Sequence, residues 1–221
     1  MTNQEILGHI DHTLLKAPST WTQIKVLCEE AITYKTASVC VPPSFVKAIH
    51  ETYGDKLTIC TVIGFPLGYN TTAVKVFEAK EAVKEGAEEI DMVINIGDLK
   101  DKKYDALETE ISSIKKVIGG KLLKVIVETC YLTEDEKIKI CQIITSAGAD
   151  FIKTSTGFGS GGATLEDIKL FKTNIGKNIK IKAAGGIKKI ENLKLFLNEG
   201  CERIGTSSAV EMLKSKQAGD H

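Results

Sequence analysis

The stretch Leu122-Leu123-Lys124-Val125-Ile126-Val127 is an apolar run interrupted by a single lysine. Strands read this way in a parallel sheet that is covered on both faces, because both sets of alternating side chains are then buried. Short β-rich runs recur along the whole chain, at His9–Thr13, Ser38–Val41, Leu57–Ile63, Glu89–Asn95, Leu122–Glu128, Phe151–Ser155, Ile179–Ala183 and Arg203–Thr206. The sequence therefore predicts eight parallel strands.

Amphipathic stretches with helical spacing lie between these runs. Two of them open on a capping-box pattern, Thr20 with Gln23 and Thr133 with Glu136. The expected helices are Trp21–Tyr34, Val74–Glu85, Tyr104–Ile118, Glu134–Ala147, Thr164–Phe171, Ile190–Glu199 and Ala209–Lys216. Strands that alternate with helices are typical of α/β folds.

Two α/β architectures fit this alternation, a closed (β/α)8 TIM barrel and an open doubly wound sheet. The open sheet usually carries a glycine-rich turn after its first strand, whereas the first strand here runs into His12-Thr13-Leu14-Leu15. The chain has 221 residues and contains no linker or low-complexity tract. We therefore expect one (β/α)8 barrel domain over residues 1–221, with a frayed end at Lys214–His221.

The charge balance argues against polyanionic partners. Lys plus Arg and Asp plus Glu number 29 each, so the chain has no bulk attraction to nucleic acid or to an anionic membrane. No apolar run approaches the roughly 20 residues that span a bilayer, and the polar N-terminus lacks a signal-peptide core. We expect a cytoplasmic protein that binds neither nucleic acid nor membrane.

Neither cysteine nor histidine forms a recognisable metal or disulfide pattern. The six cysteines are spread along the chain without a CxxC pair, which favours reduced thiols. The four histidines show no ligand spacing such as HxxxH. His12 either lines the pocket or is a satisfied core histidine. We therefore expect no metal and no other cofactor.

Two lysines occupy neighbouring predicted strands at an equivalent depth. Lys153 lies in Phe151–Ser155 and precedes the small, polar stretch Thr154-Ser155-Thr156-Gly157, while Lys182 lies in Ile179–Ala183. Each is by default an outward lysine that snorkels between helices. If both face inward, their like charges disfavour the charged form of one of them, and a neutral amine attacks carbonyls to form a Schiff base. This hypothesis makes Lys153 and Lys182 candidate catalytic residues.

Asp91 stands among Ile, Met and Val in another predicted strand, where aspartate is a poor strand former. An inward carboxylate would pair with a lysine and move protons, so we expect Asp91 to be catalytic; the alternative is a turn or capping aspartate. Lys124 and Glu128 share a face that points either inward, toward Asp91, or outward. Lys180 shares the face of Lys182, and we expect it near the barrel floor or outside the strand.

Small residues after the last strands suggest a phosphate cup at the carboxyl ends of the strands, where barrels of this kind bind phosphate with backbone N–H groups and hydroxyls. A serine in this place is also an ordinary helix cap. The expected substrate-binding residues are Gly157, Gly185, Gly186, Gly205, Ser207 and Ser208.

Taken together and in this order, several motifs resemble the deoxyribose-phosphate aldolase family along nearly the whole chain. They are Ile10-Asp11-His12-Thr13-Leu14-Leu15, Val39-Cys40-Val41-Pro42, Gly64-Phe65-Pro66-Leu67-Gly68, Glu89-Ile90-Asp91-Met92-Val93, Leu123 to Thr129, Phe151 to Gly157, Lys182 to Ile187 and Gly205-Thr206-Ser207-Ser208.

The resemblance implies a metal-free class I aldolase that cleaves 2-deoxy-D-ribose 5-phosphate reversibly to D-glyceraldehyde 3-phosphate and acetaldehyde. The family's Schiff-base lysine falls on Lys153, and its proton-shuttling pair falls on Asp91 and Lys182. Its phosphate-binding stretches fall on Gly185-Gly186 and on residues 205–208.

The resemblance departs from some family members at the C-terminal tail. Those members carry a C-terminal tyrosine implicated in proton transfer, whereas this chain ends Gln217-Ala218-Gly219-Asp220-His221. We expect water held by Asp91 and Lys182 to serve instead, and a homodimer or homotetramer as the working form. Two rivals remain, a barrel isomerase that uses Asp91 without covalent chemistry and a non-catalytic phosphosugar-binding barrel.

Overall fold

Eight parallel strands close into a barrel in which each strand pairs with its neighbours in the sequence and the last pairs with the first. The computed structural model describes residues 1–217, with the side chains of residues 1–213. The closed barrel confirms the predicted fold class over the open sheet. The strands are β1 (Ile10–Thr13), β2 (Ser38–Val41), β3 (Ile59–Ile63), β4 (Glu89–Val93), β5 (Leu122–Ile126), β6 (Phe151–Lys153), β7 (Lys180–Ala184) and β8 (Arg203–Thr206).

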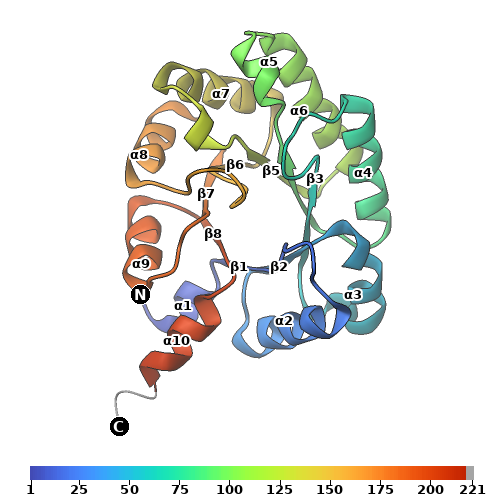
Figure 1. Cartoon of the computed structure of the whole chain (residues 1–221), viewed down its shortest axis with the longest axis vertical. Helices are drawn as coiled ribbons and strands as arrows, with labels where there is room; N and C mark the ends of the chain where they lie inside the picture. Colours follow the sequence, from blue (N-terminus) through green and yellow to red (C-terminus); the bar gives the residue numbers. More distant parts are fainter. Residues whose placement is uncertain (218–221) are drawn as a thin grey trace.

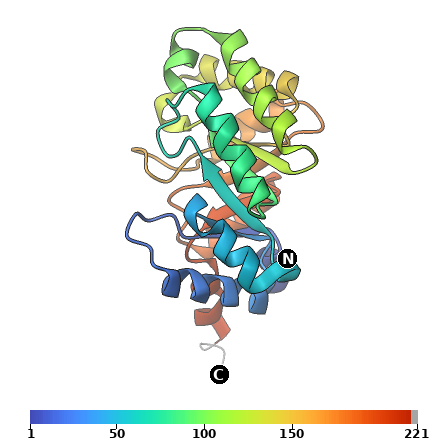
Figure 2. The same cartoon turned by 90° about the vertical axis from the view of Figure 1, so that its right-hand side faces the viewer.

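Helices surround the strands as an outer ring, which Figure 1 shows end-on and Figure 2 from the side. The helices are α1 (Asn3–Leu7), α2 (Trp21–Tyr34), α3 (Val46–Tyr53), α4 (Thr72–Lys84), α5 (Ile96–Lys100), α6 (Tyr104–Ile118), α7 (Glu134–Ala147), α8 (Leu165–Asn174), α9 (Ile190–Glu199) and α10 (Ala209–Gln217). Both predicted capping boxes are present, Thr20 with Gln23 at α2 and Thr133 with Glu136 at α7.

The sequence analysis missed the helix between β2 and β3. Helix α3 has only eight residues and follows the 3-10 turn Pro43–Phe45 directly, and its N-cap, Phe45, makes no side-chain hydrogen bond. It therefore lacks the Ser, Thr, Asp or Asn that normally marks a helix start. Of the end expected to fray, residues 214–217 belong to α10, and residues 218–221 lie outside the described residues.

Alternation along the strands separates an apolar outer layer from a charged interior. In β4, Ile90 and Met92 belong to the hydrophobic core between sheet and helices, while Glu89 and Asp91 have the opposite parity. The register then sets Asp91 beside Lys124 of β5. It also sets Lys153 beside Lys182, so side chains far apart in the sequence share one layer.

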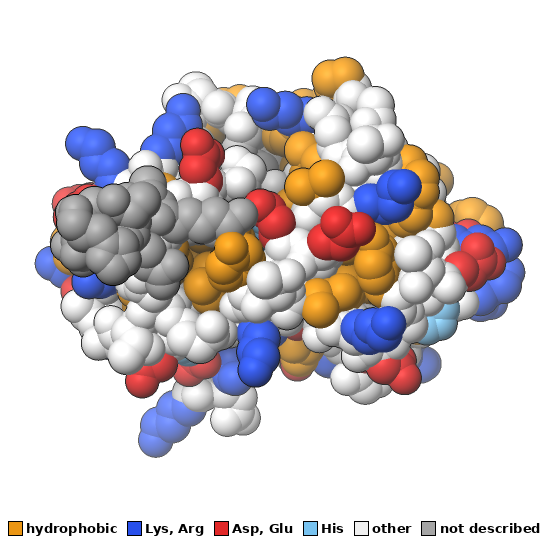
Figure 3. Space-filling model, turned by 90° about the horizontal axis from the view of Figure 1, so that it is seen from below, with side chains coloured by type: hydrophobic (Ala, Val, Ile, Leu, Met, Phe, Trp, Pro, Cys, Tyr) orange, Lys and Arg blue, Asp and Glu red, His pale blue; other side chains and the backbone are white. Residues whose placement is uncertain are grey.

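The outer surface mixes charges of both signs. Figure 3 shows Lys and Arg interspersed with Asp and Glu on the face seen from below, with hydrophobic side chains between them. Among the described helices, none combines the length and the apolar character needed to cross a membrane.

Candidate active site

Lys153 ends β6 and lies at the boundary between the charged interior and a cavity. Its side chain is 3% exposed, and its Nζ donates a hydrogen bond to Asp91 Oδ2 at 2.7 Å. The same residue lines a cavity of about 710 Å³ above the carboxyl ends of the strands. Lys153 therefore faces inward, and a molecule in the cavity can reach its amine without the barrel opening.

Asp91 is the centre of the buried charge cluster. It is fully buried and accepts hydrogen bonds from Lys153 and Lys182 on Oδ2, both at 2.7 Å, and from Lys124 on Oδ1 at 2.9 Å. Burial alone would raise the pKa of Asp91, but Lys124, Lys153 and Lys182 together hold that pKa well below its usual range. Asp91 is therefore a carboxylate and not a turn or capping residue.

Lys182 lies between two carboxylates, Asp11 and Asp91. Burial opposes its charge, yet the attraction of Asp11 and Asp91 outweighs burial and raises its pKa above the usual range. Lys182 is thus a cation, and it supplies the like charge that Lys153 faces. Gly205 makes room for it, because a Cβ at that position would lie 3.2 Å from Lys182 Cε.

Burial answers the two questions that the sequence left open about Lys124 and Lys180. Lys124 is fully buried and faces inward, 2.6 Å from Glu89 and 2.9 Å from Asp91. Lys180 is the first residue of β7, and its side chain is 54% exposed near Glu202. Of the two places expected for Lys180, near the barrel floor or outside the strand, the structure shows the first.

Three charged residues of the interior were missed by the sequence analysis, namely Asp11, Glu89 and Arg203. Arg203 donates to both carboxylates, to Glu89 Oε1 at 2.7 Å and to Asp11 Oδ1. Asp11 and Glu89 carried the same signal as Asp91, an acid inside a β-rich run, and could have been found with it.

The cavity brings together every residue that was predicted for the phosphate cup. Gly157, Gly185, Gly186, Gly205, Ser207 and Ser208 all line it. The loop that follows β6 packs directly on the end of β7, since a Cβ at Gly162 would lie 2.3 Å from the carbonyl oxygen of Gly185. Only a glycine fits there, so these two walls of the cavity are fixed against one another.

Further residues of the cavity were not among the predicted site residues. Lys16 and Lys188 line it and bring positive charge to the side that carries the small residues. Phe158 also lines it and packs edge-to-face on Phe65, with ring centroids 5.4 Å apart. The cavity thus combines a cationic wall with an aromatic one, which suits a small phosphorylated molecule.

Glu128, the other open position on the β5 side, organises the cavity loop. It is buried, has a left-handed backbone with φ 55°, and accepts a hydrogen bond from Thr156 N at 3.2 Å. Thr156 Oγ1 in turn accepts a hydrogen bond from Phe158 N. Glu128 therefore shapes the loop after Lys153 instead of joining the lysine cluster.

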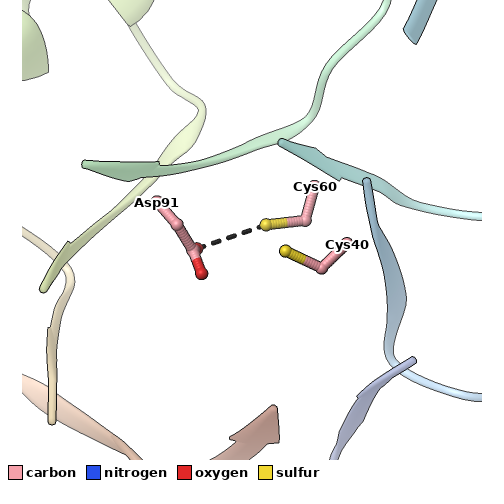
Figure 4. Close-up of side chains that lie close together, drawn as sticks. All are labelled: Cys40, Cys60 and Asp91. Atoms are coloured by element: carbon pink, nitrogen blue, oxygen red, sulfur yellow. Dashed lines mark hydrogen bonds between the residues drawn. The ribbon is translucent and has the colours of Figure 1, made fainter. Parts of the chain in front are cut away.

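His12 does not point to metal or acid-base chemistry at the cavity. Its Nε2 lies 2.9 Å from Glu30 Oε2, and it is absent from the residues that line the cavity. In the described part of the chain, Cys40, Cys60 and Asp91 lie close enough together to be considered as metal ligands, as Figure 4 shows. A metal ion there would have to displace the lysines that already neutralise Asp91.

Comparison with known proteins identifies the family. Residues 6–206 match the family model described as DeoC/LacD family aldolase. Proteins named deoxyribose-phosphate aldolase are 62% identical over 217 residues in Clostridium botulinum (98% of each chain) and 60% identical over 218 residues in Clostridioides difficile (99% of this chain, 100% of the relative).

Solved structures agree with this result. A structure described as a putative deoxyribose-phosphate aldolase from Coccidioides immitis superimposes with a TM-score of 0.94 at 38% identity, covering 98% of this chain and 87% of the other. A deoxyribose phosphate aldolase from Aeropyrum pernix, described as tetrameric, gives 0.91 at 29% identity, covering 98% and 93%. The full-length match in sequence and fold shows that this chain belongs to the DeoC/LacD family of aldolases.

Proposed function

We propose that this aldolase cleaves 2-deoxy-D-ribose 5-phosphate reversibly to D-glyceraldehyde 3-phosphate and acetaldehyde, through a Schiff base on Lys153. One observation carries the proposal: the Lys153 amine is held 2.7 Å from Asp91 at the floor of a cavity that also has cationic and hydroxyl-bearing walls. Relatives that match the whole chain are named for this activity.

The reaction begins at the amine. Neutral Lys153 adds to the C1 aldehyde of the open-chain sugar, and the carbinolamine loses water to give an iminium cation. The C3 hydroxyl loses its proton as the C2–C3 bond breaks, and the electron pair of that bond moves into the iminium to form an enamine. D-Glyceraldehyde 3-phosphate leaves, the enamine carbon is protonated, and water releases acetaldehyde and returns Lys153.

Asp91 and Lys182 move the protons in this scheme, with water between them and the substrate. Because its pKa is held so low, Asp91 passes a proton on and does not store it. Lys182 remains charged between Asp11 and Asp91, so it can return a proton to the enamine through the same water. The C-terminal tail, to which some family members assign this last step, lies outside the described residues.

The glycines and serines of the cavity are proposed to hold the 5-phosphate. Gly185 and Gly186 offer backbone N–H groups, and Ser208 offers a hydroxyl next to the start of α10. Ser208→Ala should raise KM for the phosphorylated sugar about tenfold, the value of a hydrogen bond to a charged group. Unphosphorylated 2-deoxyribose is the matched control, and an equal rise in its KM would contradict the assignment.

The activity itself is tested by a coupled assay for acetaldehyde release from 2-deoxy-D-ribose 5-phosphate. Borohydride added during turnover reduces a Schiff base to a stable amine, so it should inactivate the enzyme only when substrate is present. Acetaldehyde release without inactivation would exclude the covalent route. Binding without release would favour a non-catalytic phosphosugar-binding barrel, and isomerisation without inactivation would favour the isomerase.

We further propose that residues 1–221 act as one aldolase domain in a cytoplasmic homodimer or homotetramer. The support for assembly is a set of exposed apolar side chains in and before α4, namely Leu67, Tyr69, Val74 and Phe77. A relative of 29% identity is described as tetrameric. Light scattering on the purified protein would show a single mass of one chain if this part of the proposal is wrong.

A further inference from the structure

The catalytic lysine is the upper end of a continuous chain of buried ion pairs that reaches the barrel floor. From the floor upward, Arg203 contacts Glu89 at 2.7 Å and Glu89 contacts Lys124 at 2.6 Å. Lys124 then contacts Asp91 at 2.9 Å, and Asp91 contacts Lys153 at 2.7 Å. We call this chain, with Asp11 and Lys182, the charge ladder.

The charge ladder holds unequal numbers of acids and bases. Its acids are Asp11, Glu89 and Asp91, and its bases are Lys124, Lys153, Lys182 and Arg203. Three acids balance three of the four bases, so the ladder is neutral when one base is unprotonated and carries a net positive charge when none is. A net charge is costly in a buried environment, which favours the neutral count.

Lys153 is the base that lacks a second acid. Lys124 contacts Asp11, Glu89 and Asp91, and Lys182 contacts Asp11 and Asp91, whereas the described contacts of Lys153 comprise one carboxylate oxygen, which it shares with Lys182. The pKa values of Lys124 and Lys182 are raised because their acids outweigh burial, and the guanidinium of Arg203 keeps its proton in any protein.

We propose that Glu89 and Arg203, two positioning residues at the barrel floor, set the charge count that leaves Lys153 as a neutral amine. This inference rests on the proposed Schiff-base function and adds residues that do not line the cavity. They act on Lys153 only through the charges of the ladder.

Other titratable groups near Lys153 must be included in the count. The thiols Cys40 and Cys60 point into the same space, and Cys60 donates a hydrogen bond to Asp91 at 3.2 Å (Figure 4). Burial raises the pKa of Cys60, while the neighbouring Cys60 thiol lowers the pKa of Cys40. On the cavity side, charge is carried by Lys16, Lys188 and Glu211.

The test measures borohydride trapping with substrate as a function of pH, in wild type and in variants of the floor pair. Removing a cation with Arg203→Met makes the ladder neutral with Lys153 protonated, since an amine takes a proton more readily than a carboxyl does. On the acid limb of the pH profile, trapping falls because Lys153 becomes protonated. The midpoint of this limb should rise by about one pH unit, which makes trapping tenfold slower at a given pH on that limb. Removing an anion with Glu89→Gln should move the midpoint down.

The double variant Glu89→Gln with Arg203→Met removes one acid and one base, so the charge ladder again has one base more than it has acids. Its midpoint should return to the wild-type value even if the side chains around the two substituted positions repack. Arg203→Lys keeps the charge and should not move the midpoint. Lys180→Met removes an exposed charge from the same end of the barrel and should also leave it unchanged. Cys40→Ala should leave it unchanged if the thiol is neutral.

Three outcomes would overturn the inference: shifts of the same sign in the two single variants, a double variant that does not return to the wild-type midpoint, or a full-unit shift in Cys40→Ala. If Arg203→Met does not fold, the inference is still tested by two variants: Glu89→Gln should shift the midpoint down, and Arg203→Lys should leave it unchanged. Absence of any Lys153 adduct in the wild type would instead remove the proposed function. Trapping on Lys153 with the same midpoint in wild type and in all variants would contradict the proposed role of Glu89 and Arg203 but leave the Schiff-base function standing.

Discussion

Two buried sets of opposite charges in this barrel behave in opposite ways. Outside the strands, Lys75 of α4 and Glu110 of α6 form an ion pair at 2.7 Å, and Lys75 also donates to the Val93 carbonyl at 2.8 Å. Inside the strands, Asp91 contacts three lysines at once. Both sets are almost fully buried.

The pKa directions show what the number of partners does. In the outer pair burial outweighs the attraction between Lys75 and Glu110, so the pKa of Lys75 is lowered and that of Glu110 is raised. In the inner set the several lysines together outweigh burial, and the pKa of Asp91 is lowered. A buried charge with one partner is marginal, whereas a network keeps its members ionised and leaves Lys153 next to them for chemistry.

The largest expected effect follows from removing the amine of the inner set. Lys153→Met should lower aldolase turnover on the order of 10⁴-fold, because no other group provides the electron sink. The free energy of unfolding should stay close to that of wild type, since the remaining acids and bases of the charge ladder are equal in number. A steady-state assay beside urea unfolding would contradict this if activity persisted or the fold collapsed.

Removing one member of the outer pair should affect stability instead of chemistry. Lys75→Met leaves Glu110 buried without its cation, which should lower the free energy of unfolding by about 3–5 kcal/mol. Turnover per folded molecule should change little, because Lys75 is absent from the cavity lining. Urea unfolding and active-site titration measure the two separately, and a large loss of turnover without loss of stability would refute the distinction.

Acid should unfold the protein through the inner set. The folded-state pKa values of Asp11 and Asp91 lie below the usual value of 3.8, so their contribution to stability is complete above that pH. Below it, only the unfolded chain takes up these protons, and at least about 2 kcal/mol should be lost as the pH falls through the folded-state values. Unfolding free energies measured from pH 5 to 2 that did not fall would contradict the lowered pKa values.

The raised pKa of Glu110 has the opposite sign, so its contribution is present below its usual value of 4.5 and is lost as the pH rises through the folded-state value. The double variant Lys75→Met with Glu110→Leu removes both charges and should be within about 1 kcal/mol of wild type. Its unfolding free energy should fall with decreasing pH as that of wild type does. If the unfolding free energy of this variant did not fall at low pH, acid unfolding would be assigned to the outer pair.

The sequence could predict much of this arrangement but not all of it. The period-two pattern assigns Asp91 to a face of its strand, and the cost of an outward acid against apolar helices selects the interior. For Lys124 the same pattern left open whether the side chain faces inward or outward. For Lys180 it gives the shared face but not the depth along the barrel, because depth depends on the stagger between strands. Lys124 therefore proved to be central and Lys180 exposed.

Partner identity was the other limit. That Arg203 contacts Asp11 and Glu89 depends on closure of β8 onto β1, which brings together residues from opposite ends of the chain. Helix α3 escaped prediction because it begins without a capping side chain. The small residues of the cavity were predictable, since their place after the last strands is a property of the barrel itself.

The account depends most directly on which buried lysine forms the Schiff base. Lys124, Lys153 and Lys182 all contact Asp91, and of these Lys153 borders the cavity. Reduction with borohydride during turnover, followed by peptide mapping by mass spectrometry, should find the reduced adduct on Lys153 alone. An adduct on Lys182 or Lys124, or none on any of the three, would contradict the account.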